Sequence, residues 1–378
     1  TVFSALAISV SIGLMVIVNY LEHVRAAPAW AKHAPDIGIT IADFVAPAFI
    51  FAIGLTYGGS VRRRLAAHGP QRTFEHVLKR ALALLGLGLL FTIGEQSYGF
   101  NHGQPWGTLQ AIGVATALTL PALWLAPMLR LAAALALLAG YQFMLGHGWL
   151  EVVLAASHAG IQGSLSWTAL LLLATVFADL RTSRSRFLAL ALTLLVAGLL
   201  LAPWFPISKH RMSVSFDFVV AASAALAFQL VELWVTARGP ARALVTWGNN
   251  PLVLYASHLV LLSVFLVPAV PWWHVEASLP QAVVQGVAFV LVLHLWARFL
   301  ERRGVLGAVL LAHDRGGLFG AQVGADQDRY LVAPCPAGRH PDLGVAQNLI
   351  AARGALGPNH HGIDRTVAPD ALDERARH

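Results

Sequence analysis

The chain has 378 residues, of which 57% are hydrophobic and only 12% are charged. Soluble globular domains carry about 25% charged residues, so this composition excludes an ordinary soluble domain and predicts an all-α polytopic membrane protein. The formal net charge of +7 comes from arginines in short loops between apolar runs, which argues against a nucleic-acid-binding patch. Cys335 is the single cysteine, which excludes an intrachain disulfide and a cysteine cluster, and we expect no metal centre.

Apolar windows of membrane length predict about ten spanning helices. The windows are 4–20, 41–57, 77–95, 108–125, 129–145, 165–179, 187–203, 214–235, 252–270 and 281–300. Arginines gather in the loops after the even-numbered windows, so the positive-inside rule predicts that these loops and both ends of the bundle are cytoplasmic. The other loops are poor in Lys and Arg, with the exceptions of Arg25, Lys32, Lys209 and Arg211.

The character of the sequence changes after about residue 311. Residues 312–378 are rich in Gly, Pro, Asp, Arg and His and have almost no helical or alternating periodicity. This composition is typical of disordered segments. We therefore predict a transmembrane domain at 1–311 and a disordered cytoplasmic tail at 312–378, with readthrough or a frame error in the gene as the alternative origin of the tail.

Residues 30–60 hold the polar groups that point most directly to chemistry. His33 lies in a polar loop, and Asp43 then begins an apolar window. Insertion of a carboxylate costs roughly 2.5 to 3.5 kcal/mol at the centre of a membrane helix, so such groups are usually functional. Pro47 lies one turn after Asp43 and frees a backbone carbonyl nearby. The pattern predicts a broken, polar helix entrance beside a histidine.

His33, Asp43 and Asn19 are the catalytic candidates because all three fall at one predicted membrane level. An imidazole beside a carboxylate can act as a general base near neutral pH or as a nucleophile that accepts an acyl group. Each residue also has a structural interpretation. His33 could simply be solvated, Asp43 could cap its helix, and Asn19 could end the first helix.

Five further polar residues are candidates for substrate binding. Gln110 begins the fourth window from the outer side, Asn249 and Asn250 precede the ninth window, and Tyr255 and His258 follow one and two turns inside it. Polar side chains at this depth normally face the bundle interior. The structural alternative for Gln110 and His258 is a hydrogen bond between neighbouring helices.

Three segments together carry a family resemblance. They are Asn19-Tyr20 with His33-Ala34 and the run from Gly38 through Asp43 and Pro47 to Gly54; Leu109-Gln110 with Gly113; and Gly248-Asn249-Asn250-Pro251 with Tyr255 and His258. These segments resemble the heparan-α-glucosaminide N-acetyltransferase family of transmembrane acyltransferases, and the likeness covers about residues 5–300. The resemblance implies that His33 is the catalytic histidine, Asn19 a supporting site residue and Asp43 the matching acid. The chain departs from the family pattern at Ala111, where the family has arginine, and at 21–23, which replace a glycine run.

Known family members are similar in taking acetyl from cytosolic acetyl-CoA and delivering it to a sugar amine across the membrane. The resemblance therefore implies an acyl-CoA donor and an extracytoplasmic sugar amine or hydroxyl as acceptor. Coenzyme A is anionic, so cytoplasmic arginines are candidates for its phosphates: Arg62, Arg63, Arg64 and Arg242. The Ala-, Leu- and Arg-rich composition points to a bacterial inner membrane, and a homodimer is one option for the assembly.

The competing interpretation is a polytopic transporter. In that case Asp43, His258 and Asp217 would line a solute or proton path. Inverted repeats would favour a transporter, and the sequence shows none. A non-catalytic assembly protein is the third interpretation.

Overall fold

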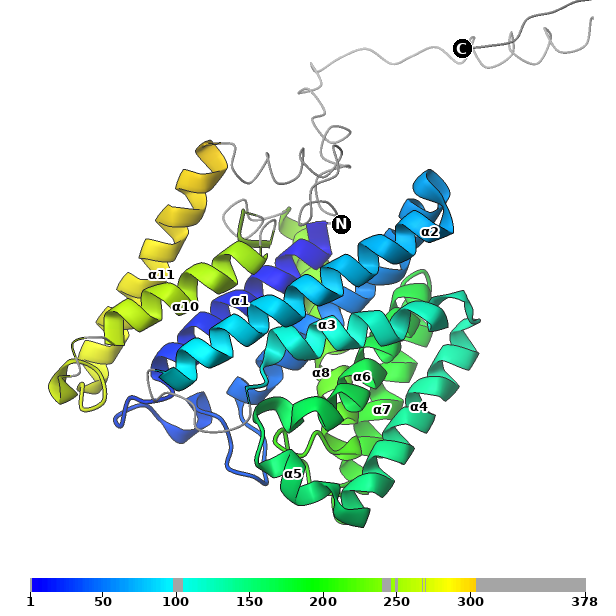
Figure 1. The fold of residues 1–378 in the computed structure, drawn as a ribbon, viewed down its shortest axis with the longest axis horizontal. Helices are drawn as coiled ribbons and strands as arrows, with labels where there is room; N and C mark the ends of the chain where they lie inside the picture. The colour runs from blue at the N-terminus through cyan, green and yellow to red at the C-terminus, as the bar shows by residue number, and fades with distance from the viewer. Residues whose placement is uncertain are drawn as a thin grey trace, which may run out of the picture. The chain divides into compact units, whose positions relative to one another are not determined.

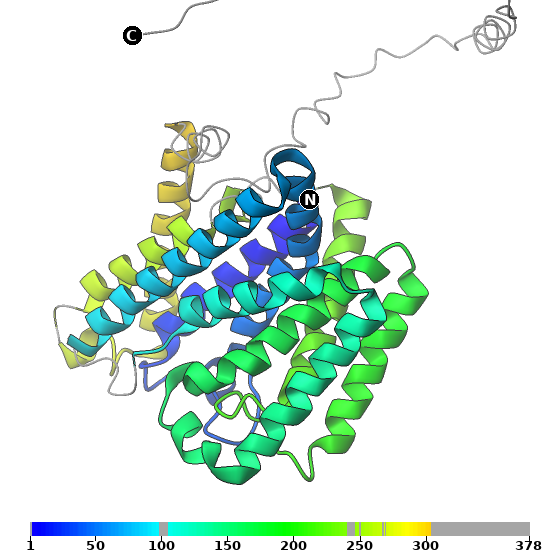
Figure 2. The same cartoon turned by 45° about the vertical axis from the view of Figure 1, so that its right-hand side comes forward.

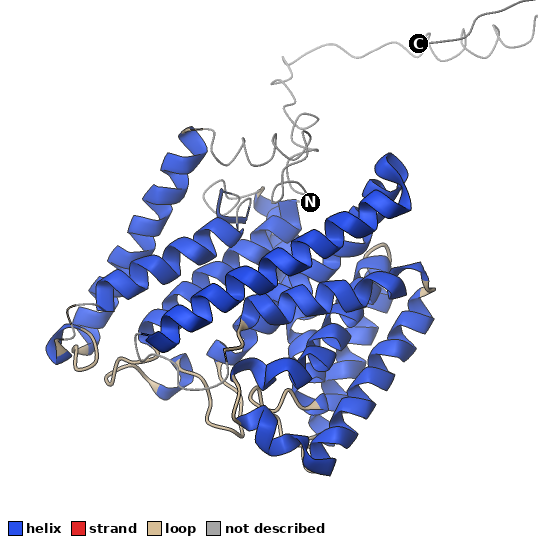
Figure 3. Ribbon diagram, viewed as in Figure 1, coloured by secondary structure: helices blue, strands red, loops and turns tan. Residues whose placement is uncertain are grey.

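The computed structural model describes residues 2–97, 105–239, 246–248, 251–266, 268 and 270–303. These residues form helices joined by loops and short turns, and no strand occurs among them (Figures 1 and 3). The predicted all-α class is confirmed for this part of the chain. The described residues all belong to one compact unit, Thr1–Asp328, and the predicted tail with Cys335 lies outside them.

The main helices follow the apolar windows closely. They are α1 (Val2–Leu21), α2 (Val45–Ser97), α3 (Thr108–Thr119), α4 (Pro127–Met144), α5 (Leu150–Leu154), α6 (Gly160–Leu180), α7 (Arg184–Leu201), α8 (Val214–Arg238), α10 (Pro251–Leu266) and α11 (Leu279–Arg302). Short 3₁₀ turns are η1 (Ala29–Ala31), η2 (Ile41–Phe44), η3 (Leu120–Trp124), η5 (Ser157–Ala159) and η6 (Pro271–Trp273), and η4 (Leu145–Trp149) is a π-helical turn.

Helix α2 consists of two helical legs that meet at a non-helical residue, Gly69, so separate helices are present for the windows 41–57 and 77–95 as expected. Both legs are longer than expected and extend into the arginine-rich segment between the windows. That segment contains Ala, Leu, Arg, Gln and Glu, which all favour helix. A hydropathy window detects only the apolar part of a helix, so it cannot show that the helix extends beyond the membrane-length run.

The chain reverses within α2 at Gly69. This residue has φ 77° and ψ 174°. Glycine tolerates the positive φ, and the extended ψ suits the residue before a proline. Tyr57 on the first leg donates its hydroxyl to the Thr116 carbonyl at 2.7 Å, while Gly88 on the second leg lies against Gln110. Both legs therefore pack along α3, as Figures 1 and 2 show.

Six helices of the described part are long and apolar enough to cross a membrane, with α2 counted once. Three shorter apolar helices occupy Ala7–Leu21, Thr108–Trp124 and Pro251–Leu266. These helices support a multi-pass membrane protein. The count of ten spans and the cytoplasmic position of both ends stay predictions, because length and composition do not test them.

Helix α6 is the centre of the bundle. The structure buries 78% of its apolar window, against 22% of the windows in α7 and α11, which leaves the outer helices with apolar surface for lipid. Close packing around α6 depends on small residues. Gly54 of α2 lies so near α6 that a Cβ atom there would collide with the Cβ of Ala174.

Two loops that are far apart in the sequence pair with each other at one end of the helices. They are the loop at 22–40, which follows α1, and the loop at 202–213, which joins α7 to α8. The Gly38 N–H donates to the Ile207 carbonyl at 2.9 Å, and Gly38 forms an isolated parallel bridge with Ser208. This pairing brings residues from opposite halves of the chain together.

Candidate functional site

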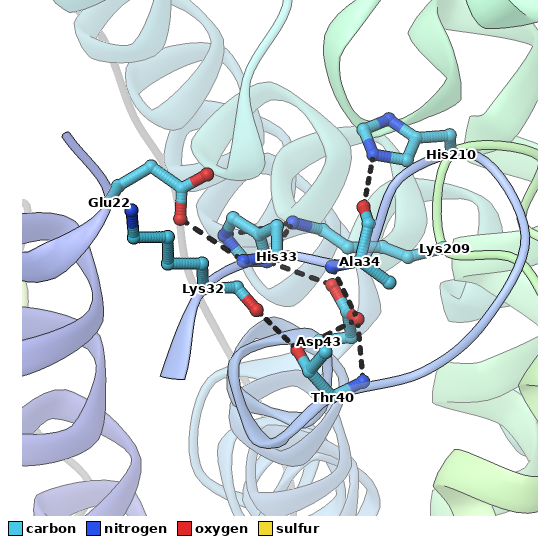
Figure 4. Close-up of polar contacts among 8 residues, drawn as sticks. All are labelled: Glu22, Lys32, His33, Ala34, Thr40, Asp43, Lys209 and His210. Atoms are coloured by element: carbon cyan, nitrogen blue, oxygen red, sulfur yellow. Dashed lines mark hydrogen bonds and ion pairs between the residues drawn. The ribbon is translucent and has the colours of Figure 1, made fainter. Parts of the chain in front are cut away.

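His33 and Asp43 form a hydrogen-bonded pair where the first loop enters α2. The Nδ1 atom of His33 lies 2.8 Å from Oδ1 of Asp43 (Figure 4). Because a carboxylate only accepts hydrogen bonds, Nδ1 carries the hydrogen and the neutral ring keeps its lone pair on Nε2. The side chain of Asp43 is fully buried, whereas that of His33 is 26% exposed. The carboxylate therefore binds the ring on its buried side.

Asp43 also takes part in the capping box at the start of η2, with Thr40 as the N-cap residue. Its second oxygen, Oδ2, accepts from the backbone N–H groups of Thr40 at 2.9 Å and Ala34 at 3.2 Å. The Thr40 hydroxyl donates to the Lys32 carbonyl at 2.6 Å, which fixes the loop above the turn. The capping interpretation and the pairing with His33 therefore use different oxygens of one carboxylate.

Two charged groups complete the surroundings of His33. A carboxylate oxygen of Glu22 accepts the His33 backbone N–H at 3.1 Å. The Nζ atom of Lys209 lies 3.0 Å from Nδ1 and 3.1 Å from Nε2 of His33. Burial lowers the pKa of Lys209 from its usual 10.5 to about 8, against the opposing effect of Asp43 and Glu22.

An ion pair fixes the loop that carries Lys209. The guanidinium of Arg211 binds both carboxylate oxygens of Asp36, with Nε at 2.8 and 3.0 Å, and the Ser208 hydroxyl donates to the same carboxylate at 3.1 Å. The hydrogen bond from Arg211 holds the pKa of Asp36 below its usual value. His210 Nε2 lies 3.2 Å from the Ala34 carbonyl and adds a second tie between the loops.

A cavity of about 650 Å³ opens beside His33. Four residues predicted for the site line it: Asn19, His33, Gln110 and Tyr255. Polar residues that were not singled out from the sequence as site residues also line it: Glu22, His23, His158, Lys209 and His210. The second leg of α2 and helix α10 supply most of its apolar wall. The cavity therefore joins a polar end, made by the loops, to an apolar end between helices.

Asn19 and His258 are hydrogen-bonded to each other across α1 and α10. Asn19 Nδ2 lies 3.0 Å from His258 Nε2, and His258 is fully buried and does not line the cavity. Gln110 caps its own helix, because its Oε1 accepts the Gly107 N–H at 3.1 Å, and it reaches Thr92 of α2 at 3.3 Å. Both predicted interhelical alternatives are thus present, and Asn19 and Gln110 also face the cavity.

The predicted coenzyme A arginines lie away from this cavity. Arg62 pairs with Asp179 at 3.4 Å, Arg63 is exposed, and Arg64 lines a separate pocket of about 20 Å³ together with Arg80. The remaining predicted ligands fall outside the described residues: Arg242, Asn249 and Asn250. Their roles stay predictions.

The three acidic and histidine residues of the transporter interpretation do not share this cavity. Asp43, His258 and Asp217 are all fully buried, and none of them lines it. Asp217 instead forms a hydrogen bond with Ser166 inside the bundle. Within the described ranges, no three His, Cys, Asp or Glu side chains are grouped as metal ligands would be.

Lys209 is the site residue that sequence reasoning missed. It lies 176 positions from His33 in the chain, and no local motif links the two. One signal pointed to it, since Lys209 and Arg211 are cations in a loop predicted to be poor in them. Such charges need a local partner, and Asp36 and Asp43 are those partners.

A family comparison agrees with this geometry. Residues 6–157 match the family model described as "Heparan-alpha-glucosaminide N-acetyltransferase, catalytic". A search of curated protein sequences found no significant match. The matched region contains Asn19, His33, Asp43 and Gln110, whereas Lys209 follows it. Over residues 6–157 the family model therefore supports the resemblance to heparan-alpha-glucosaminide N-acetyltransferases that the sequence motifs carry.

Proposed function

We propose that this protein moves an acetyl or similar acyl group from acyl-CoA to an extracytoplasmic sugar amine or hydroxyl. The observation that carries the proposal is the His33 imidazole, hydrogen-bonded to buried Asp43 and lining a cavity of about 650 Å³. Binding pockets for small molecules measure about 300 to 1,000 Å³. The cavity thus has the size for the reacting ends of two substrates.

The chemistry follows from the hydrogen bonds of the ring. Asp43 holds the hydrogen on Nδ1, so Nε2 of His33 offers a lone pair. That lone pair can attack the thioester carbonyl, or it can remove a proton from the acceptor as the acceptor attacks. In both routes the ring gains positive charge, which the Asp43 carboxylate stabilises.

The two ends of the cavity suggest how the substrates approach. Loop residues such as His23 and His210 line its polar end, which suits a hydrophilic acceptor. Coenzyme A phosphates would bind the arginines Arg62, Arg63, Arg64 and Arg242, and its pantetheine arm would enter the bundle toward His33. The loop charges support an outward position for His33 and a cytoplasmic position for these arginines.

The setting of the reaction belongs to the same proposal. The multi-pass protein would reside in a bacterial inner membrane, with a small molecule or a glycan as acceptor. Assembly as a homodimer would be compatible with this function.

Transfer of radiolabelled acetyl from acetyl-CoA to a panel of amino sugars tests the function. The purified protein in lipid nanodiscs should transfer the label. His33→Ala should lower the rate by about 10²- to 10⁴-fold, the contribution of a positioned acid–base group. His68→Ala is the matched control, because His68 is exposed on α2 and should leave the rate unchanged. If the intact protein neither transfers the label nor hydrolyses acetyl-CoA, the result would support a transporter or an assembly protein instead.

A further inference from the structure

The ammonium of Lys209 lies over the His33 ring rather than on its free nitrogen. Its Nζ atom is almost equally far from the two ring nitrogens, at 3.0 and 3.1 Å. The lone pair of Nε2 points away from Nδ1 in the ring plane, so an atom equidistant from both nitrogens is not on that axis. Lys209 therefore lies beside the reacting atom and leaves the Nε2 lone pair open.

The fold holds Lys209 in this place through its neighbours in the chain. The residues on either side of it are tied to the first loop by the Gly38–Ser208 bridge and the Asp36–Arg211 ion pair. Lys209 itself is only 8% exposed, yet it lines the cavity. A buried lysine costs free energy unless charged partners compensate, so its position beside a reactive ring needs an explanation.

The charged groups around Lys209 allow its side chain to change protonation state. The titratable groups that interact with it are Glu22 after α1, His33 and Asp43 before α2, and His158 before α6. His210 follows it in the chain and has its Nε2 at the Ala34 carbonyl. Two carboxylates and one ammonium leave a net charge of about −1 when the imidazoles are neutral. The cluster can therefore accept one further positive charge, which acyl transfer places on the His33 ring.

We propose that Lys209 is a catalytic residue of the acyl transfer, which gives a proton to the departing thiolate and takes one back from the acceptor. The inference rests on the proposed function of the same site. It adds a residue from outside the family-matched region 6–157. It also assigns the proton that the His33–Asp43 pair does not supply.

The proton and bond changes balance in the acyl-enzyme route. His33 Nε2 bonds to the acyl carbon, the carbon–sulfur bond breaks, and the Lys209 ammonium protonates the sulfur, so a neutral thiol leaves. The acceptor amine or hydroxyl then bonds to the acyl carbon and the carbon–nitrogen bond to His33 breaks. Neutral Lys209 takes the proton that the acceptor loses, and both residues return to their starting forms.

The direct route uses the same proton donor. There His33 Nε2 takes the proton of the attacking acceptor while Lys209 protonates the sulfur. After the products leave, neutral Lys209 regains a proton as Nε2 loses one, and both residues return to their starting forms. Burial lowers the pKa of Lys209 to about 8, close to the value of about 8.5 for a thiol. Proton exchange between matched groups is efficient, which supports the assignment on either route.

The test compares two donors with different leaving groups. Acetyl-CoA releases an alkyl thiol that needs a proton, whereas 4-nitrophenyl thioacetate releases an aryl thiolate that is stable without one. Lys209→Met should lower kcat with acetyl-CoA by about 100-fold and should change kcat with the aryl donor little. Lys209→Arg should be as slow as Lys209→Met with acetyl-CoA, because arginine keeps its charge but does not release a proton.

Lys32→Met is the matched control, because it removes a lysine of the neighbouring loop whose contact to the site is made by its backbone. It should retain full activity with both donors. The aryl donor also reports folding, since its turnover requires an intact cavity and His33. Equal losses with both donors, or recovery by Lys209→Arg, would overturn the proton-transfer role. Inactivity of the wild-type protein with acetyl-CoA would instead remove the proposed function itself.

Discussion

Replacement of Asp43 by asparagine separates the two tasks of its carboxylate. Oδ1 accepts the hydrogen on Nδ1 of His33 at 2.8 Å, and Oδ2 accepts the backbone N–H groups of Ala34 and Thr40 at 3.2 and 2.9 Å. An asparagine of the same shape has one accepting oxygen and one donating NH₂ group. The oxygen should stay with the two backbone donors, because the opposite rotamer would turn NH₂ toward both of them.

The NH₂ group of the introduced asparagine would then face Nδ1 of His33. Nδ1 must accept from that group, so the ring hydrogen moves to Nε2 and the reactive lone pair is lost from the cavity side. The same change in a Ser-His-Asp triad lowers kcat by about 10⁴-fold through the wrong tautomer. We expect a fall of about 10²- to 10⁴-fold in acetyl transfer for Asp43→Asn.

Stability should fall much less than activity. The variant keeps both backbone hydrogen bonds and exchanges one charge-assisted bond for a neutral one, which costs about 1 to 3 kcal/mol of unfolding free energy. Initial rates, thermal unfolding and ¹⁵N NMR of labelled histidine measure the three effects. Glu75→Gln is the control, because Glu75 is an exposed carboxylate on α2. A folded Asp43→Asn protein with the wild-type rate would refute the tautomer argument.

Two further predictions concern the packing and the loops. Gly54→Ala should cost about 1 to 3 kcal/mol of unfolding free energy because its Cβ collides with Ala174, whereas Gly86→Ala, with free space around it, should gain up to about 1 kcal/mol; equal melting temperatures would contradict this. Arg211 lowers the pKa of Asp36, so the ion pair stabilises the fold above the ordinary carboxyl pKa of about 3.9 and this contribution is lost as the pH falls through the lowered value. Asp36→Asn should therefore destabilise by about 1 kcal/mol at pH 7, with allowance for solvent screening, and the difference from wild type should shrink in unfolding measurements below about pH 4.

The helices were largely predictable because membrane helices leave a strong local signal. Each of the ten apolar windows contains helix in the structure. The continuation of α2 through its arginines was not predicted, since hydropathy measures burial in lipid and not helix propensity. Gly69 and Pro70 mark the reversal by their backbone preferences, which act over two residues and are invisible to a window average.

Direct contacts of His33 were predictable only where the partner is near in sequence, although Asn19, Gln110 and Tyr255 also line the cavity as candidates chosen from the sequence. His33 and Asp43 are ten positions apart and belong to one loop and turn, so their pairing could be inferred from the local pattern. Lys209 reaches His33 only because the loop at 202–213 pairs with the loop at 22–40. That pairing depends on tertiary contacts such as Asp36 with Arg211, and no periodicity in the sequence encodes it.

The two oxygens of Asp43 bear on why a carboxylate is kept at the end of a membrane-length segment. The capping box at the start of η2 requires an acceptor on Asp43 for the backbone N–H of the N-cap residue Thr40, and Oδ2 supplies it together with one for Ala34. A neutral amide at this position could accept both bonds without a buried charge. The bond from Oδ1 to His33 is therefore the contact that helix capping does not explain. Fixing one imidazole tautomer at the wall of a cavity does explain it, because that contact leaves the lone pair on Nε2.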